Sequence, residues 1–186
     1  MFFSPVPFLF FSGILNKIRC SKRKYRGVIF LDPYGLEVRS ETLKLIVATE
    51  CFDVWYLFPT SGVYRQAPRD HIALDRTKRN ALNNLFGTRS WESAFYDKSC
   101  EGTNKQLGFL DDMEEEQNLK RTATVKQIED WGKKWLEGIF SYVSAPLVLP
   151  RKGTQFYSLF FCVSNKSKKA INLAKKVSAH ILNQPL

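Results

Sequence analysis

Two short, continuous apolar runs restrict the possible folds of this chain more than any other feature. Residues 27–32 read Gly-Val-Ile-Phe-Leu-Asp and residues 53–58 read Asp-Val-Trp-Tyr-Leu-Phe, and a proline follows each run. Runs of this length without polar alternation are typical of strands that are buried on both faces of a parallel sheet. At 186 residues, the chain is long enough to bury one sizeable core. We therefore expect an α/β protein with a parallel sheet.

Helical periodicity predicts four helices between and after these strands. Their expected ranges are 40–48, 72–86, 125–140 and 167–182. Ser40 is the expected N-cap of the first helix, and Gly87 is the expected C-terminal stop of the second. The residues expected to face the core are Leu43, Ile46 and Val47 in the first helix and Ala170, Leu173, Val177 and Ile181 in the last. A polar, basic loop is expected between Pro59 and the second helix. Residues 97–124 are expected to form a linker-like insertion or the exposed start of a helix.

A second pair of strands is predicted near the C-terminus, over residues 142–149 and 156–163, joined through Pro150 and Gly153. Their short connection favours an antiparallel hairpin, which the last predicted helix follows. We expect this hairpin to lie beyond strand 53–58, at the opposite edge of the sheet from strand 27–32. One long side of strand 27–32 would then be bare, since the two prolines in residues 1–15 fit a sheet poorly.

Basic residues outnumber acidic residues in this chain. There are 28 Lys and Arg against 18 Asp and Glu, which gives a net charge of +10. This balance favours a polyanionic partner such as nucleic acid, and the alternative is that a basic surface serves solubility alone. The four cysteines stand far apart without CxxC spacing and there are only two histidines, so no metal site is expected. Cys51 and Cys162 lie in apolar runs and are expected to be core residues in a reducing compartment.

Residues 1–15 form an apolar stretch that bears on the location of the protein. Pro5 and Pro7 interrupt it, and it is shorter than the roughly 20 residues that a membrane-spanning helix needs. Basic residues follow this stretch, whereas a secretory signal begins with them. An inverted signal-anchor is the remaining alternative. We expect a soluble, cytoplasmic protein that has no membrane partner.

The carboxyl ends of both predicted strands carry groups that can bind a ligand. Asp32 and Pro33 can accept hydrogen bonds from an exocyclic amino group, and Tyr34 can stack on a base. The alternative interpretation is a strand-ending turn with Gly35 at a positive φ. After the second strand, Arg65 is the cation expected to lie beside this loop.

The chain beyond this second strand end is rich in cations. The candidates for contact with nucleic-acid phosphates are Arg69, Arg76, Lys78 and Arg79. The alternative interpretation of these residues is the solvated beginning of a helix. His71 has no evident nucleophile or metal partner in the sequence and is given no role. No glycine-rich loop of the GxGxxG or P-loop kind occurs, so the chain alone is expected to hold no cofactor.

Seven ordered segments of the sequence resemble the three-Cys-motif partner protein family. They are YRGVIFLDPYG (25–35), DVWYLFP (53–59), GVYR (62–65), LFGTRSWESAFY (85–96), WLEGIF (135–140), APLVLP (145–150) and FYSLFFCVSNKSKKAINLAKKVSAHIL (156–182). The resemblance implies a Rossmann-like fold related to S-adenosylmethionine-dependent methyltransferases and a three-Cys-motif protein as partner. It also implies that the site is lined by Asp32, Pro33, Tyr34, Gly35 and Arg65, and it names no catalytic residue.

The chain also departs from the family pattern. It lacks the glycine-rich turn and the acidic strand end with which a methyltransferase would hold its cofactor, and residues 1–24 resemble nothing in the family. Tyr64 stands where relatives often have Asn. We therefore expect residues 25–186 to be the C-terminal part of a methyltransferase-like α/β domain, N-terminally truncated and inactive alone. S-adenosylmethionine would bind only together with the missing N-terminal half. The alternative function is a nucleic-acid-binding or protein-interaction module that acts with a partner protein.

Overall fold

Both apolar runs form neighbouring parallel strands of one mixed sheet. The computed structural model describes residues 26–98, 119–149 and 156–182. Strand β1 (Gly27–Leu31) pairs in parallel with β2 (Phe52–Phe58), and Leu31 lies opposite Tyr56. Branched and aromatic side chains dominate both strands and suit the extended backbone. The prediction of two adjacent parallel strands is confirmed.

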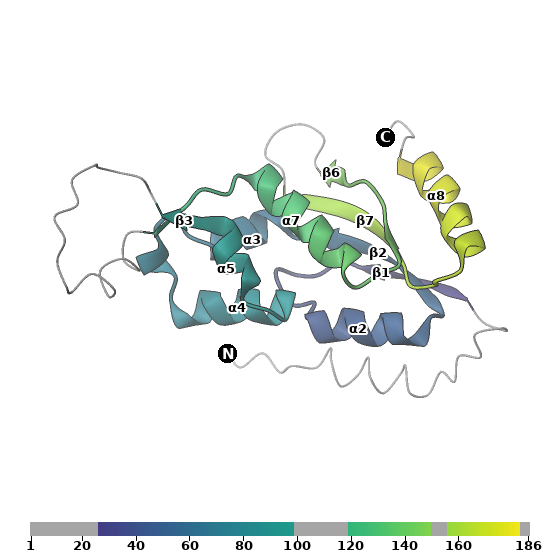
Figure 1. Ribbon diagram of the computed structural model, residues 1–186, viewed down its shortest axis with the longest axis horizontal. Helices are drawn as coiled ribbons and strands as arrows, with labels where there is room; N and C mark the ends of the chain where they lie inside the picture. Colours follow the sequence, from purple (N-terminus) through teal and green to yellow (C-terminus); the bar gives the residue numbers. More distant parts are fainter. Residues whose placement is uncertain (1–25, 99–118, 150–155, 183–186) are drawn as a thin grey trace.

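The predicted C-terminal hairpin extends the sheet on the other side of β2. Strand β7 (Tyr157–Val163) runs antiparallel beside β2, and β5 (Tyr142–Val143) and β6 (Leu147–Leu149) pair with the outer side of β7. The strand order is therefore β1-β2-β7-β5, with β6 also paired to β7. Figure 1 shows β1, β2, β7 and β6 of this sheet. Within the described residues, β1 is an edge strand. The expected position of the hairpin is confirmed, but the single strand predicted over 142–149 is two short strands, β5 and β6. The fold is a mixed α/β structure.

Helices cover the two faces of the sheet unequally. The α-helices are α2 (Ser40–Thr49), α3 (Thr60–Gln66), α4 (Arg76–Phe86), α5 (Ser90–Phe95), α7 (Val125–Glu137) and α8 (Lys168–Leu182), and the short strands β3 (Tyr96–Lys98) and β4 (Leu119–Arg121) form a separate pair. The inner face, which carries Val54, Tyr56 and Phe58, packs on α2, α4 and α7. The outer face, which carries Trp55 and Phe161, packs on α8, the one helix that contributes to this second cluster of described residues.

Strand β1 contradicts the expectation that it is buried on both faces. Ile29 packs on the inner core, but Val28 and Phe30 are 62% and 60% exposed. Phe30 lies opposite Trp55 of β2, so these two residues share the outer face. Helix α8 packs on the β7 side of that face and leaves these β1 residues in contact with solvent. The apolar run therefore predicted a strand correctly but not the covering of its second face.

Helix α2 does not use Ser40 as its N-cap. Arg39 occupies the cap position without a side-chain hydrogen bond, and Ser40 is the first helical residue. The Ser40 hydroxyl is buried against the end of α4, where a methyl group on Gly87 would lie 2.6 Å from its oxygen. Gly87 has a φ of 66° and ends α4, as predicted. Its missing side chain lets α2 and α4 approach each other.

The basic stretch after β2 contains two helices, whereas the sequence pattern predicted a loop and then one helix over 72–86. Helix α3 begins directly after Pro59, and α4 begins only after a separate 3₁₀ turn, η1 (His71–Ala73). Asp75 caps α4, because its Oδ1 accepts a hydrogen bond from the Lys78 amide at 2.9 Å. This local cap decides where the helix begins, and apolar spacing alone does not reveal it.

Helix α8 faces the sheet with a different side from the one predicted. Three residues that were expected to point inward are exposed, namely Leu173 (64%), Val177 (44%) and Ile181 (48%). The buried residues are Ala174 and Ser178, and Ala170 is half-buried. Small side chains let the helix backbone approach Phe161 closely, so packing against the sheet selects the small face of α8 and not the large apolar one.

Cys51 and Cys162 are both buried, in agreement with their expected core position. Cys162 lies in β7 opposite Val54, and burial raises the pKa of its thiol. Because the thiolate is the reactive form, this cysteine is inert while the sheet is intact.

Several sequence expectations fall outside the described residues. They concern the N-terminal segment 1–24, most of the insertion at 97–124, and the connecting residues Pro150 and Gly153. Among the helices that are described, none has both the length and the apolar character needed to cross a bilayer.

Helix α7 approaches the sheet closely at Gly132. A methyl group on Gly132 would lie 2.7 Å from Cζ of Phe58, well inside van der Waals contact. Phe58 is wholly buried, so its ring has little room to move away. Glycine within a helix costs about 1 kcal/mol relative to alanine. Close packing of α7 on Phe58 offsets this cost.

Gly132→Ala is expected to lower the free energy of unfolding by about 1–3 kcal/mol, because the added methyl group overpacks the core at Phe58. Urea denaturation followed by circular dichroism measures this change. Lys134→Ala, at an exposed position of the same helix, is the control and is expected to change the free energy by less than about 0.5 kcal/mol. A Gly132→Ala variant as stable as the unchanged protein would contradict the close approach.

Candidate functional site

The carboxyl ends of β1 and β2 lie side by side at one end of the sheet, because the two strands are parallel neighbours. The loop after β1 reaches α3, where a methyl group on Gly62 would lie 3.3 Å from Cδ2 of Leu36. Gly62 is buried, so its missing side chain makes room for this contact. The structure thus brings together the two strand ends that the sequence predicted as ligand-binding.

The loop after β1 exposes part of its Asp-Pro-Tyr-Gly segment. Pro33 is buried, whereas Asp32 and Tyr34 are exposed. Gly35 has a φ of 78°, the conformation that the turn interpretation requires. Arg65 is exposed in the last turn of α3, the helix that begins at the carboxyl end of β2. Neither Asp32 nor Arg65 forms an ion pair with another described residue.

The four cations selected as phosphate contacts differ in their surroundings. Lys78 and Arg79 are paired with carboxylates, at 3.0 and 3.1 Å. Arg69 and Arg76 are exposed and have no ion pair within the described ranges. A phosphate would have to break an existing pair to reach Lys78 or Arg79. Arg69 and Arg76 are therefore the better placed of the four.

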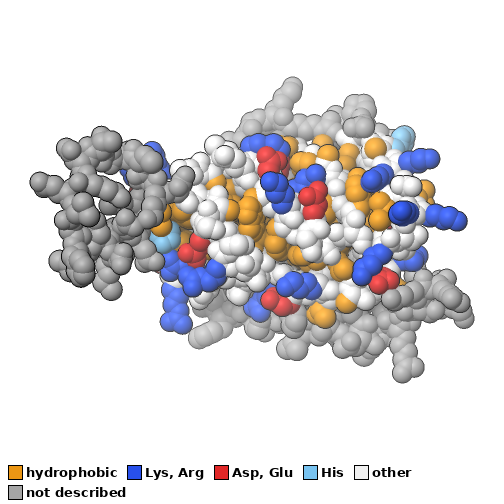
Figure 2. Space-filling model, in the orientation of Figure 1, with side chains coloured by type: hydrophobic (Ala, Val, Ile, Leu, Met, Phe, Trp, Pro, Cys, Tyr) orange, Lys and Arg blue, Asp and Glu red, His pale blue; other side chains and the backbone are white. Residues whose placement is uncertain are grey.

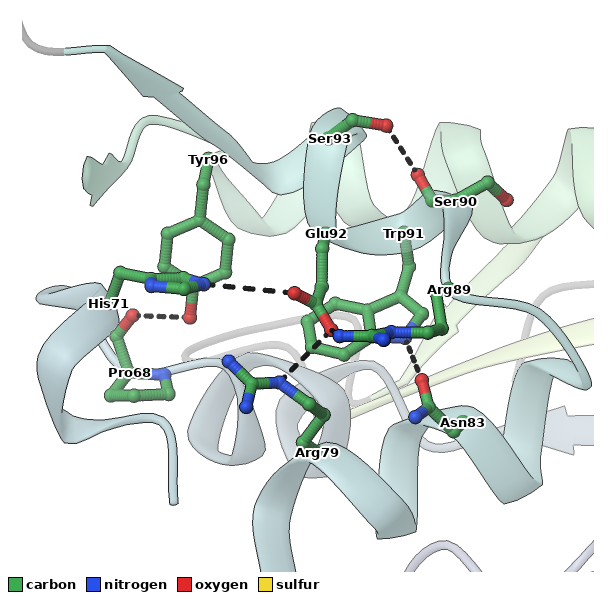
Figure 3. Close-up of polar contacts among 10 residues, drawn as sticks. All are labelled: Pro68, His71, Arg79, Asn83, Arg89, Ser90, Trp91, Glu92, Ser93 and Tyr96. Atoms are coloured by element: carbon green, nitrogen blue, oxygen red, sulfur yellow. Dashed lines mark hydrogen bonds and ion pairs between the residues drawn. The ribbon is translucent and has the colours of Figure 1, made fainter. Parts of the chain in front are cut away.

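The Glu92 carboxylate of α5 draws together two arginines and a histidine (Figure 3). Arg79 lies 3.1 Å, Arg89 3.6 Å and His71 3.7 Å from its oxygens. The His71 ring also meets the Tyr96 ring edge-on, with 5.0 Å between the ring centroids. His71, for which the sequence offered no partner, thus lies against an acid and an aromatic ring. These contacts attach α5 to α4 and η1, which is a structural role.

Two tyrosines near this cluster have pKa values shifted in opposite directions. The Tyr96 hydroxyl donates to the Pro68 carbonyl at 2.8 Å, and burial raises its pKa to about 12. The Arg121 guanidinium lies 3.6 Å from the centroid of the Tyr64 ring, and its hydrogen bond to the phenol lowers the pKa of Tyr64. Arg121 belongs to β4, and its backbone amide donates a hydrogen bond to the Arg69 carbonyl. Sequence reasoning missed Arg121, because only the pairing of distant segments brings it here.

A buried polar chain links α3, β7 and α7 at the end of β2. Thr60 Oγ1 lies 2.8 Å from Ser158 Oγ, and the Ser158 hydroxyl donates to Glu129 Oε2 at 2.5 Å. Lys126 Nζ, on the same helix as Glu129, lies 2.5 Å from its other oxygen. Thr60, Ser158 and Glu129 are wholly buried, so no substrate can reach the serine. The chain therefore holds α7 on the sheet, although a serine beside a carboxylate resembles a catalytic pair.

The described ranges contain no group of three or more His, Cys, Asp or Glu residues that could hold a metal ion. Comparison of the chain with protein-family models, with curated proteins and with solved structures finds no match.

Ser158→Ala is expected to lower the free energy of unfolding by about 1–3 kcal/mol, because the buried Glu129 carboxylate loses a hydrogen bond. Thermal and urea unfolding measure the loss. Ser93→Ala makes the same change at an exposed position of α5 and is expected to stay within about 0.5 kcal/mol of the unchanged protein. Equally small losses in both variants would contradict the buried bond.

Tyr64 is expected to ionise at a lower pH than an ordinary tyrosine, whose pKa is about 10. Alkaline titration of phenol absorbance measures this, as the difference between the unchanged protein and Tyr64→Phe. Because the pKa is lower in the folded state, the interaction of Arg121 with the phenolate adds stability at alkaline pH. That stability is lost as the pH falls through the folded-state pKa. Arg121→Met is expected to return the Tyr64 titration to its usual range, and a Tyr64 component that already titrates there would contradict the contact.

Proposed function

We propose that the segments at the carboxyl ends of β1 and β2 bind a stretch of single-stranded nucleic acid. The observation that carries this proposal is Tyr34, whose side chain is 91% exposed on an anchored loop. Pro33 on one side of it is buried, and Leu36 on the other packs against Gly62 of α3. An aromatic ring held in water adds little to the stability of the fold, but it offers a flat surface on which a base can stack.

Polar and charged groups on the segments that follow β1 and β2 supply the other contacts that a nucleotide needs. Arg65 and Arg69 are exposed and have no ion pair within the described ranges, so they can meet phosphates without breaking a pair. Asp32, exposed next to the buried Pro33, can accept a hydrogen bond from an exocyclic amino group. The net charge of +10 favours the approach of a polyanion.

The proposal places this site on a methyltransferase-like α/β domain of the three-Cys-motif partner type. Its support is the Asp-Pro-Tyr-Gly loop at the end of a parallel strand, together with a sheet that continues from β2 into an antiparallel hairpin. The proposed role is nucleic-acid binding in the cytoplasm together with a three-Cys-motif protein. It does not include methyl transfer by this chain, because the sequence has no glycine-rich turn to hold S-adenosylmethionine.

Fluorescence anisotropy with labelled single-stranded DNA and RNA oligonucleotides at low salt tests the proposal. Tyr34→Ala is expected to weaken binding about 5- to 150-fold, which corresponds to one stacked base at about 1–3 kcal/mol. Tyr34→Phe keeps the ring and is expected to bind like the unchanged protein. Ile72→Ala removes an exposed apolar side chain in η1 and is the control.

A pair of charge variants separates the proposed site from the effect of net charge. Arg65→Ala and Lys169→Ala each remove one positive charge. Arg65 belongs to the proposed site, whereas Lys169 lies at the beginning of α8, which follows β7 near the amino end of β2. Only Arg65→Ala is expected to reduce the salt dependence, by about 0.7 in the slope of log affinity against log salt. Equal effects of both variants, or unchanged binding by Tyr34→Ala, would assign the binding to net charge and overturn the proposed site.

A further inference from the structure

The outer face of the sheet is only partly covered by the described residues. Helix α8 packs on Phe161 and Val163 of β7 and reaches Trp55 of β2. The same face continues to β1, where Val28 and Phe30 are more exposed than covered. Apolar side chains of the sheet therefore lie open beside α8.

The side of α8 that is turned toward β1 is apolar as well. Lys175 Nζ lies 5.3 Å from the centroid of the Tyr142 ring, so the side of α8 that carries Lys175 is turned toward β5. Leu173 and Val177 are each two positions from Lys175, about 200° around the helix. They are therefore on the side of β2 and β1 in the strand order. We call the exposed residues Val28, Phe30, Leu173 and Val177 the outer apolar surface.

Positive charge borders the outer apolar surface. Residues 165–182 contain five lysines and no Asp or Glu. Lys169 and Lys176, both exposed, lie about one helical turn before and after Leu173. At the end of the molecule where α8 lies, Figure 2 shows apolar side chains and basic groups side by side. Asp53, opposite Val28 on this sheet face, already accepts a hydrogen bond from the Ser164 amide at 3.2 Å.

From this combination of an apolar surface and a basic border, we propose that the outer apolar surface docks an amphipathic helix of a partner protein whose polar face is acidic. Apolar side chains of that helix would cover Phe30, Leu173 and Val177, and its carboxylates would pair with Lys169 and Lys176. Burial of an apolar helix face supplies affinity, and the charges select the acidic partner. This docking surface is separate from the nucleic-acid site, and either proposal can fail without the other.

A synthetic amphipathic peptide with Leu on one face and Glu on the other, labelled with fluorescein, is the probe. The control probe has Lys in place of every Glu. In anisotropy titrations at physiological salt, the Glu peptide is expected to bind saturably and at least about tenfold more tightly than the Lys peptide, a difference of about 1.4 kcal/mol. Equal affinity of the two peptides, or no saturable binding of the Glu peptide, overturns the proposal.

Two double variants locate the binding on the protein. Leu173→Gln with Val177→Gln removes apolar contacts, and Lys169→Glu with Lys176→Glu reverses the local charge. Each pair is expected to weaken binding of the Glu peptide at least about tenfold. All four positions are exposed, so the fold is expected to persist, and circular dichroism checks this.

Matched controls carry the same changes elsewhere on the described surface. Ile72→Gln replaces an exposed apolar residue of η1, and Lys44→Glu with Lys134→Glu reverses two exposed charges on α2 and α7. These controls are expected to leave the affinity for the Glu peptide within about threefold, since distant surface charges are screened. Equal weakening by the controls would assign the binding to net charge and overturn the proposal.

Two other occupants of the outer apolar surface are outcomes that would overturn the proposal. Dimers detected by sedimentation equilibrium and abolished by Leu173→Gln with Val177→Gln would assign the surface to a second copy of this chain. Sedimentation with phosphatidylserine-containing vesicles, abolished by the same variant while the Glu peptide fails to bind, would assign it to an anionic membrane.

Discussion

The pairing of β2 with β1 on one side and with β7 on the other holds the described structure together, because both layers of helices are attached to this part of the sheet. The inward side chains of β2, Val54, Tyr56 and Phe58, are wholly buried, and Phe58 is the residue that α7 approaches at Gly132. Parallel pairing with β1 also brings the two strand ends of the candidate site together. The core and the site therefore depend on the same strand.

The contacts at the end of β2 explain why α7 occupies one position on the sheet. Gly132 fits against Phe58, and the buried Glu129 carboxylate meets the Ser158 hydroxyl from β7. If α7 moved by one turn, a side chain would replace Gly132 at the ring and the carboxylate would leave its partners. An unpaired buried charge costs several kcal/mol, so steric fit and polar pairing favour the same position of the helix.

The sequence predicted the parts of this structure that depend on local patterns. Continuous apolar runs identified the strands, and the rule that parallel strands share a carboxyl edge brought Tyr34 and Arg65 to the same end of the sheet. The sequence contains no local pattern that predicts contacts between distant segments. Arg121 reaches Tyr64 through pairing of β4, and Glu129 lies in an amphipathic helix where an acid is normally expected in solvent. For the last helix, α8, the sequence pattern predicted that the large apolar residue Leu173 faces the core. In the structure, the helix backbone packs closely on the sheet, and this favours small side chains at the contact.

The position of Cys162 has a consequence for how opening of this sheet can be followed. This thiol lies in the strand between β2 and the β5–β6 edge, is wholly buried, and has a raised pKa. A thiol reagent can therefore modify it only in molecules whose sheet has separated from its helices. In native buffer, the rate of modification at Cys162 itself becomes a measure of how often the core opens, and it requires no denaturant.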